Sequence, residues 1–531
     1  MKNILLFIIT SCVFIFGYST AKGQQLILSD TTWSSDTIRV YNDVIVQYPA
    51  TLSINPGVYI EFQGNYSLSI LGGIKAIGTE SDSIIFTVNN YASIDDTTTS
   101  EGGWGGIKLL SNDADTAIFK YCRFSYGKAV VAGDYWGDPE NEENKGGAIY
   151  LYDYAHLRIS NSLFYHNRSN YSGGGMVINN CNTAEIYNNH FKYNFTHFLG
   201  GGIFIEESDY SIVSGNLFTY NTAFYVVIGF ANGVGSGIAV YCNTTIINNR
   251  FFSNNSVNGA LYESSYNSIV ANNILANNLG TGMVVGGSDL GISKVSNNII
   301  VNNESYSPNG CGILFYGDAV KMRNNIVTGN TFYVEGFHLD QVYTPLDVKA
   351  DFAYSCNPDE PIYYEGVGNI QDDPLFVNPT TGAGSDYDGL SADWSLLDSS
   401  PCVNTGTPDI SELNLPDTDI LGNPRVYGIR IDMGAIENQM VVGLPKNPLV
   451  NASLQISPNP FGQRFKVVSP AGQKISSISL YNKNGKLLGK IEKLPFDQLM
   501  VYDLANQSAG LYLMVTQFEN GNVESTKLVK Y

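Results

Sequence analysis

Hydrophobic and polar positions recur along the central part of the chain at intervals of 24–33 residues. In each repeat, two asparagines that stand five residues apart flank one apolar position. A second apolar position stands upstream of the first asparagine, and a glycine opens a short apolar run later in the repeat. The first apolar column contains Phe164, Phe191, Phe218, Phe251, Leu275, Ile300 and Val327, and the upstream column contains Ile159, Ile186, Val213, Ile246, Val270, Val295 and Met322.

This pattern predicts a stack of coils made of short β-strands. A short strand with one apolar face cannot bury that face alone, whereas stacking successive coils buries a continuous apolar column. A period near 25 residues fits three short strands and three turns in each coil. The N-terminal segments Leu52–Ile54 and Val58–Phe62 alternate around a Pro56-Gly57 turn, so they are expected to begin the same stack.

The asparagine columns predict structural ladders rather than a metal or sugar site. Asparagine tolerates left-handed turns, and its amide can bond to the asparagine of the next coil. The first column contains Asn189, Asn216, Asn249, Asn273, Asn298 and Asn325, and the second contains Asn167, Asn194, Asn221, Asn254, Asn278, Asn303 and Asn330.

The pattern divides the chain into five parts. Residues 1–23 have a basic Lys2, a short apolar stretch and the small–x–small triplet Ala21-Lys22-Gly23, which predicts a signal peptide. An alternative is lipidation at Cys12, since residues 9–12 match a lipobox. Residues 24–330 are the predicted β-helix, 331–440 break the period and are the predicted cap, 441–450 are a linker, and 451–531 are a small alternating β domain with an Asn484-Gly485 hairpin turn.

Composition narrows the partners. The chain has 29 Lys and Arg against 49 Asp and Glu, a formal charge of −20, which excludes a nucleic-acid partner because phosphate binding needs a basic face. No transmembrane segment is predicted in the mature chain. Its six cysteines lack metal-ligand spacing and are expected as buried small side chains, although Cys356 and Cys402 could pair. They are Cys122, Cys181, Cys242, Cys311, Cys356 and Cys402.

The columns and the Asn-rich coils resemble the right-handed parallel β-helix (pectate-lyase-like) proteins secreted by bacteria, over about residues 26–330. Segments within 331–440, such as Asp373-Pro374-Leu375-Phe376 and Ile431-Asp432-Met433-Gly434, resemble the closing segment of bacterial surface β-helix proteins. The resemblance implies an all-β solenoid. It does not imply an activity, because that fold carries lyases, hydrolases, esterases, epimerases and adhesins.

The C-terminal domain resembles the type A sorting domain of the type IX secretion system of Bacteroidota. That resemblance implies a β-sandwich that engages the secretion machinery, with export across the outer membrane and surface attachment or release. The alternative is a small β-sandwich with an unrelated binding role. The residues that carry the resemblance are Ser457, Pro458, Asn459, Pro460, Gly485, Gly510, Tyr512, Lys527 and Lys530.

Candidate chemistry gathers in the insertion at residues 127–147. Its carboxylates could bind Ca²⁺, the cofactor that a lyase would need beside a uronate, and its aromatic side chains could stack on a sugar ring. Basic groups on neighbouring coils could take a proton. The alternative is a solvated acidic loop. The candidates are Asp134, Asp138, Glu140, Glu142 and Glu143 for metal binding, Tyr135 and Trp136 for stacking, and Arg123, Arg158, Arg168 and His166 for catalysis.

Two functions therefore stay open at this point. The first is a non-catalytic, adhesin-like protein that presents some of its 35 tyrosines to an extracellular polysaccharide. The second is a polysaccharide lyase or glycoside hydrolase. An enzyme needs acidic and basic side chains that converge on one open face, so the positions of Arg123, Arg158 and Arg168 relative to the insertion carboxylates distinguish the two.

Overall fold

The computed structural model divides the chain into two compact units, Met1–Gln439 and Met440–Tyr531. The structure describes residues 23–110, 116–134, 137–227, 230–287, 291–306, 312–316, 320–333, 341–343, 351–358, 366–439, 454–468, 474–492, 500–518 and 523–531. The predicted signal peptide up to residue 22, Cys12 and the 441–450 linker lie outside these residues. Among the residues described, no helix has the length and apolarity to cross a membrane.

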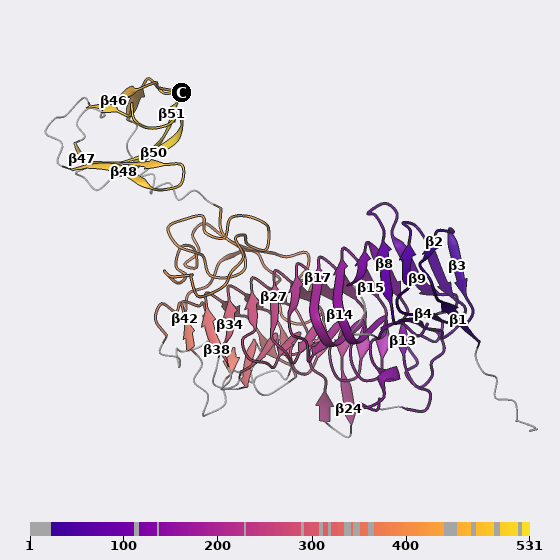
Figure 1. The fold of residues 1–531 in the computed structure, drawn as a ribbon. Coiled ribbons are helices and arrows are strands. Elements are labelled where there is room, and N and C mark those ends of the chain that lie inside the picture. Colours follow the sequence, from indigo (N-terminus) through magenta and orange to yellow (C-terminus); the bar gives the residue numbers. More distant parts are fainter. Residues whose placement is uncertain are drawn as a thin grey trace, which may run out of the picture. The chain divides into compact units, whose positions relative to one another are not determined.

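The first unit is a solenoid of parallel strands, seen from the side in Figure 1. Two of its walls merge into one 22-stranded sheet, because the long strands β14 and β17 run across both. Its strands are β1 (Gln24–Ile27), β2 (Thr31–Trp33), β4 (Asp43–Val46), β5 (Thr51–Ile54), β7 (Leu68–Ile70), β8 (Gly73–Ile77), β10 (Ile107–Leu109), β11 (Thr116–Lys120), β14 (Ile149–Ser160), β17 (Met176–Tyr187), β20 (Ile203–Glu206), β21 (Ser211–Ser214), β26 (Ile238–Val240), β27 (Thr244–Ile247), β30 (Leu261–Glu263), β31 (Ile269–Ala271), β33 (Met283–Gly286), β34 (Ser293–Ser296), β37 (Ile313–Tyr316), β38 (Val320–Arg323), β41 (Val342–Tyr343) and β42 (Asp351–Ala353).

The third wall is an 11-stranded parallel sheet. Its strands are β3 (Thr37–Val40), β6 (Tyr59–Phe62), β9 (Ile84–Val88), β12 (Cys122–Ser125), β15 (Leu163–Tyr165), β18 (His190–Lys192), β22 (Leu217–Thr219), β28 (Arg250–Phe252), β32 (Ile274–Ala276), β35 (Ile299–Val301) and β39 (Ile326–Thr328).

Short strands complete the coils. They are β13 (Lys128–Ala129), β16 (Arg168–Ser169), β19 (Phe195–Thr196), β23 (Thr222–Ala223), β29 (Asn255–Ser256), β36 (Glu304–Ser305) and β40 (Thr331–Phe332), with a hairpin of β24 (Tyr225–Val227) and β25 (Phe230–Asn232) and one 3₁₀ turn at Glu142–Asn144.

The repeat columns define the register of the solenoid. Phe164, Phe191, Phe218 and Phe251 are paired from strand to strand and fully buried, and their ring centroids are 4.4, 5.0 and 4.7 Å apart. The upstream apolar column is paired in the same way along the 22-stranded sheet. The predicted all-β solenoid is therefore confirmed, and its core is one continuous stack of side chains.

Both asparagine columns form hydrogen-bonded ladders inside the turns. Asn194, for example, donates from Nδ2 to Asn221 Oδ1 at 2.9 Å and to the carbonyl of Phe164 at 3.0 Å. Asn221 Oδ1 also accepts from the Asn194 backbone N–H at 3.1 Å. The second ladder ends at Gln341, whose Oε1 accepts from Asn330 Nδ2 at 2.8 Å. Each amide thus satisfies buried backbone groups that a turn would otherwise leave unpaired.

Residues 366–439 form what we call the closing segment, which contains the hairpin of β43 (Phe376–Asn378) and β44 (Asp393–Leu396). Parallel pairing continues through β41 and β42, and the closing segment packs on the outer side of the last coils. Trp394 and Ile436 bury Ile274 and Ile299 there. Figure 1 shows this orange segment beside the pink C-terminal coils and away from the indigo N-terminal ones.

The cysteines described are free thiols. Cys122, Cys181, Cys356 and Cys402 are buried, and Cys242 is half-buried. Cys311 lies outside the described residues. Cys356 and Cys402 share one apolar cluster at the junction of the last coil and the closing segment.

The second unit has two antiparallel sheets around its own core. One contains β45 (Gln455–Ser457), β46 (Arg464–Val468) and β49 (Met500–Asp503), and the other contains β48 (Leu487–Glu492), β47 (Ile475–Asn482), β50 (Gly510–Phe518) and β51 (Val523–Lys530). The sandwich predicted here is therefore confirmed at the level of its sheets.

Candidate functional site

Two carboxylates of the 127–147 insertion, Asp134 and Asp138, bind the insertion itself. Asp134 Oδ2 accepts from the Asp138 backbone N–H at 2.8 Å and from Asn144 Nδ2 at 2.5 Å. Asp138 Oδ1 accepts from the Glu140 N–H at 2.9 Å. Among the residues described, no three His, Cys, Asp or Glu side chains are arranged to hold a metal ion.

The Glu140 side chain is exposed, and the two remaining carboxylates of the insertion face the neighbouring coil. Glu143 forms an ion pair with Lys108 of β10. Glu142 bonds to the Tyr150 hydroxyl, whose pKa is raised first by burial and then by this carboxylate. Tyr135 and Trp136 lie outside the described residues.

The basic candidates do not converge with those carboxylates. Arg158 pairs with Glu185 at 2.9 Å on the 22-stranded sheet. Arg123, on β12, donates to Ser125 Oγ at 2.9 Å and lies over the Tyr165 ring at 5.3 Å.

Arg168 and His166 do meet, at a carboxylate that sequence reasoning missed. Asp95 pairs with Arg168, and its Oδ1 lies 3.0 Å from His166 Nε2. Asp95 belongs to a loop at residues 90–103, and Lys128 anchors the same loop by donating to the carbonyls of Ser93 at 2.7 Å and Glu101 at 2.6 Å. Burial lowers the pKa of Lys128 to about 8. These cations therefore hold a loop onto the coils, and their hydrogen bonds are used within the fold.

The outer face of the 11-stranded sheet is open over β9, β12, β15 and β18, and we call this area the open face. A hollow of about 540 Å³ lies on it. The strands contribute Ile85, Arg123, Leu163 and His190, which are paired from coil to coil, and the turn at one edge contributes Asn161 and Asn188.

The opposite edge of the open face carries a row of rings, which we call the aromatic ridge: Tyr91, Tyr126, His166, Tyr193 and Tyr220. Successive ring centroids are 4.4, 5.8, 6.4 and 5.0 Å apart. Tyr193 and Tyr220 are 40% and 41% exposed, so their rings are accessible from solvent. Tyr165 supports the row with edge contacts to Tyr126 and Tyr193.

Four of these rings stand at turn positions with left-handed backbone. The φ angles of Tyr126, His166, Tyr193 and Tyr220 are +63°, +55°, +57° and +56°. A bulky residue with positive φ is uncommon and strained, whereas asparagine and glycine adopt this conformation readily. The equivalent positions of the later coils are Ser253, Asn277, Asn302 and Gly329. The aromatic half of this column therefore has a conformational cost that the solenoid itself does not require.

Cationic side chains that form no ion pair in the described part of the chain lie beside the ridge. Lys192 Nζ lies 5.0 Å from the Tyr193 ring centroid and 5.9 Å from that of Tyr220. Burial, and then Lys192, lower the pKa of His190 to about 4, so His190 is neutral at pH 7. In the part of the chain that the structure describes, no carboxylate lies within ion-pair distance of Lys192 or Arg123.

The closing segment covers the C-terminal part of the same face. Asn277 donates to the carbonyl of Gly382 at 2.9 Å, and Asn302 donates to Thr380 Oγ1 at 2.8 Å. On the sheet, Arg250 donates to the carbonyl of Ile420 at 3.3 Å. The turn column is thus aromatic where the face is open and mostly small or polar where the closing segment binds.

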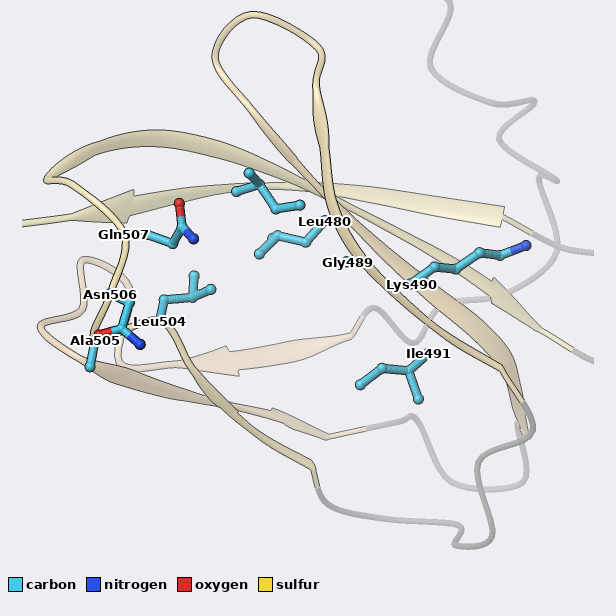
Figure 2. Close-up of a pocket in the computed structure, with 9 residues that line it drawn as sticks. Leu480, Gly489, Lys490, Ile491, Leu504, Ala505, Asn506 and Gln507 are labelled. Atoms are coloured by element: carbon cyan, nitrogen blue, oxygen red, sulfur yellow. The ribbon is translucent and has the colours of Figure 1, made fainter.

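The second unit has a hollow of its own, of about 530 Å³ (Figure 2). Leu480 and Leu504 line it, and Lys490 points away from them. Lys530 supports the 504–507 turn that forms one side, because its Nζ donates to the carbonyls of Leu504, at 2.8 Å, and Gln507. Asn459 joins the two ends of the unit, since its amide bonds to the backbone of Val529 at 2.9 Å and Lys527 at 2.8 Å.

The remaining residues of the predicted sorting motif stand at turns and strand ends. Gly485 has φ +72° in the β47–β48 turn and Gly510 opens β50, while the Tyr512 hydroxyl bonds to the Ser508 carbonyl. Ser457 ends β45, and Pro458 and Pro460 flank Asn459.

Comparison with known proteins agrees with the geometry. A family model described as a right handed beta helix region matches residues 51–234 and 229–339, together more than half of the chain. A search of curated proteins finds no match.

Proposed function

The chain belongs to the right-handed beta helix family, and we infer that it is an exported, non-catalytic glycan-binding protein whose ligand lies along the aromatic ridge. Family membership does not decide the activity, because function depends on the site that a fold carries. The observation that carries the inference is the row of rings at Tyr126, His166, Tyr193 and Tyr220, all four of which have a strained, left-handed backbone.

Stacked coils space the rings in a way that suits a linear carbohydrate. Parallel strands lie about 4.8 Å apart, so the ridge repeats at a distance comparable with the length of one sugar unit. Tyr91 stacks on Tyr126, and Tyr193 on Tyr220, at interplanar angles of 6° and 21°. These rings therefore offer a ligand along the ridge their edges and hydroxyl groups, and polar groups beside them orient the sugar hydroxyls. Asn161, Asn188 and Arg123 provide such groups across the hollow.

The non-catalytic assignment rests on how the basic candidates are used. Arg168 and Lys128 bind the 90–103 loop, and Arg158 pairs with Glu185. None of these three side chains meets the carboxylates of the 127–147 insertion.

Affinity electrophoresis tests the binding site. The chain is run through gels that contain neutral or acidic polysaccharides, and at least one polysaccharide is expected to retard it. The variant Tyr193→Asn/Tyr220→Asn should lose about tenfold in affinity, equivalent to about 1.4 kcal/mol. Tyr210→Asn is the matched control, because Tyr210 is 59% exposed and lies outside the ridge.

Two results would count against this function. Equal retardation of the double variant and the wild type would remove the ridge from the site. New reducing ends released from any of the polysaccharides, with or without Ca²⁺, would identify the protein as a lyase or hydrolase.

For export, we propose that the second unit is the signal for type IX secretion and that the mature protein is released or held at the cell surface. Support comes from its compactness as a separate unit and from the bonds that Asn459 and Lys530 make at its ends. Removing residues 440–531 should trap the protein in the periplasm, as measured by cell fractionation. Appearance of the truncated protein in the medium at the normal level would contradict the proposal.

A further inference from the structure

The open face and the covered face are two halves of one surface. The outward column of the 11-stranded sheet runs from Arg123 through Leu163, His190, Leu217 and Arg250 without a change in pairing. The closing segment nevertheless covers this column beyond β18. Leu217 packs against the closing segment, and Arg250 bonds to it.

The closing segment begins directly beyond the last ring of the ridge. Tyr220 occupies its turn in one coil, and Ser253 and Asn277 occupy the same turn in the next two. Asn277 binds Gly382 of the closing segment, and Phe252 of β28 is buried in the same cluster as Trp394. A rod-like ligand that lies along the ridge therefore meets the closing segment at the end of the ridge marked by Tyr220.

This barrier is built into the fold. Ile274 and Ile299 are buried against it, and the side chains of Arg425 and Glu437 form an ion pair at 3.2 Å with 3% and 1% of their surface exposed. Arg425 also reaches Asn272 Oδ1 of the solenoid at 3.3 Å. Removing the segment would expose a large apolar surface, so a ligand cannot displace it cheaply.

We propose that the closing segment is an end stop for the site, so that the protein recognises the end of a glycan chain and not its interior. The proposal rests on the glycan-binding function inferred above. The ridge from Tyr91 to Tyr220 spans four coil steps, or about 19 Å, which accommodates about five sugar units. Chain length beyond that adds no contacts on the ridge.

Two ligand measurements test the end stop on the full chain. The probes are oligosaccharides of two to ten units prepared from the polysaccharide that retards the protein most. Affinity measured by titration calorimetry should rise with length and level off at about five units. A bulky fluorophore at one end of the six-unit chain should weaken binding at least tenfold, whereas the same label at the other end should be tolerated.

A pair of ridge variants tests the direction. Tyr220 adjoins the stop and Tyr91 lies farthest from it. Tyr220→Asn should weaken trimers and octamers by the same factor, and Tyr91→Ala should weaken octamers at least threefold more than trimers. Tyr210→Asn is again the control for folding, together with the thermal melting curve of each variant.

The outcomes separate the two proposals. Affinity that keeps rising up to ten units, or tolerance of the label at both ends, would overturn the end stop and leave the glycan-binding function standing. Failure of every polysaccharide in the panel to bind would overturn the glycan-binding function and this inference with it.

Discussion

The rings of Tyr193 and Tyr220 lie on adjacent coils with their centroids 5.0 Å apart and an angle of 21° between their planes. Both residues have left-handed backbone, at φ +57° and +56°. Stacking between the two rings stabilises the pair by about 1 kcal/mol, and the left-handed conformation costs about as much at each position.

Because these two effects offset each other, we expect the variant Tyr193→Asn/Tyr220→Asn to lose glycan affinity with little change in stability. Asparagine relieves the backbone strain while the ring contact is lost, so the free energy of unfolding should change by less than about 1.5 kcal/mol. Urea denaturation followed by circular dichroism measures this change. A loss of several kcal/mol would show that the ridge serves the fold and would weaken its assignment to a ligand.

The asparagine ladder predicts a large effect from one amide. Asn254 donates to Asn278 Oδ1 and to the Phe218 carbonyl, each at 2.9 Å, and accepts from the backbone and side chain of Asn221, each at 3.0 Å. Asn254→Ala leaves these buried groups unpaired, and we expect a loss of about 3–5 kcal/mol by urea denaturation. Asn182→Ala, on an exposed position of β17, is the control. Equal stabilities for the two variants would contradict a structural ladder.

Glu263 predicts a dependence of stability on pH. It stands in the inner column between Val240 and Val285, it is fully buried, and its Oε1 accepts from the Ser265 N–H at 2.9 Å. Burial raises its pKa from 4.5 to about 7. The folded state holds the proton of Glu263 more tightly than the unfolded state does. The contribution of Glu263 to stability is therefore complete below pH 4.5 and is lost as the pH rises through 7. The loss is on the order of 3 kcal/mol.

Glu263→Gln should remove this dependence of stability on pH, since glutamine stays neutral. Melting temperatures measured from pH 4 to pH 9 should then be flatter than those of the wild type, and the variant should be the more stable protein at pH 8. The exposed Glu80→Gln serves as the control. A wild-type slope that persists in Glu263→Gln would assign it to another group.

The ion pair between Arg425 and Glu437 predicts how the closing segment is held. Arg425→Met leaves the Glu437 carboxylate buried without its partner, at a cost of about 3–5 kcal/mol. Limited proteolysis should then cleave residues 380–439 much faster than in the wild type. Restoring apolar packing with Arg425→Met/Glu437→Leu should recover part of the protection. The variant Arg158→Met loses only an exposed ion pair, so the protease should cleave it at the wild-type rate.

Cys356 and Cys402 predict a covalent link between the last coil and the closing segment. A hydrogen bond with the Cys402 thiol, and then burial, raise the pKa of the Cys356 thiol, so oxidation should be slow. Once formed, the disulfide would close a loop of about 46 residues and stabilise the fold by about 4 kcal/mol. Mass spectrometry after treatment with a glutathione redox buffer should detect the 356–402 peptide pair. Its absence after complete oxidation would show that the two sulfurs do not reach each other.

The strand register could be predicted from the sequence because each coil repeats the same spacing. The positions of Phe164, Phe191 and Phe218 and of the ladder asparagines follow from that period, since a one-residue slip would turn an entire apolar column outward. The same alignment places Glu263 between Val240 and Val285, so the burial of this acid follows from the repeat pattern.

The site could not be predicted in the same way. Insertions between strands have no period, so their partners depend on which loops lie side by side in space. Arg168 and His166 were candidates to meet the carboxylates of residues 127–147, and they instead bind Asp95 from the preceding 90–103 loop.

Three residues of the aromatic ridge, His166, Tyr193 and Tyr220, can be predicted from the sequence, because each stands directly before a ladder asparagine. The sequence by itself thus determined the solenoid, its register and the left-handed turns, since all three depend on short-range pattern repeated from coil to coil. Only the tertiary structure decided that Tyr193 and Tyr220 are exposed while Asn277 is covered, because the closing segment folds back over a hundred residues onto one half of the face.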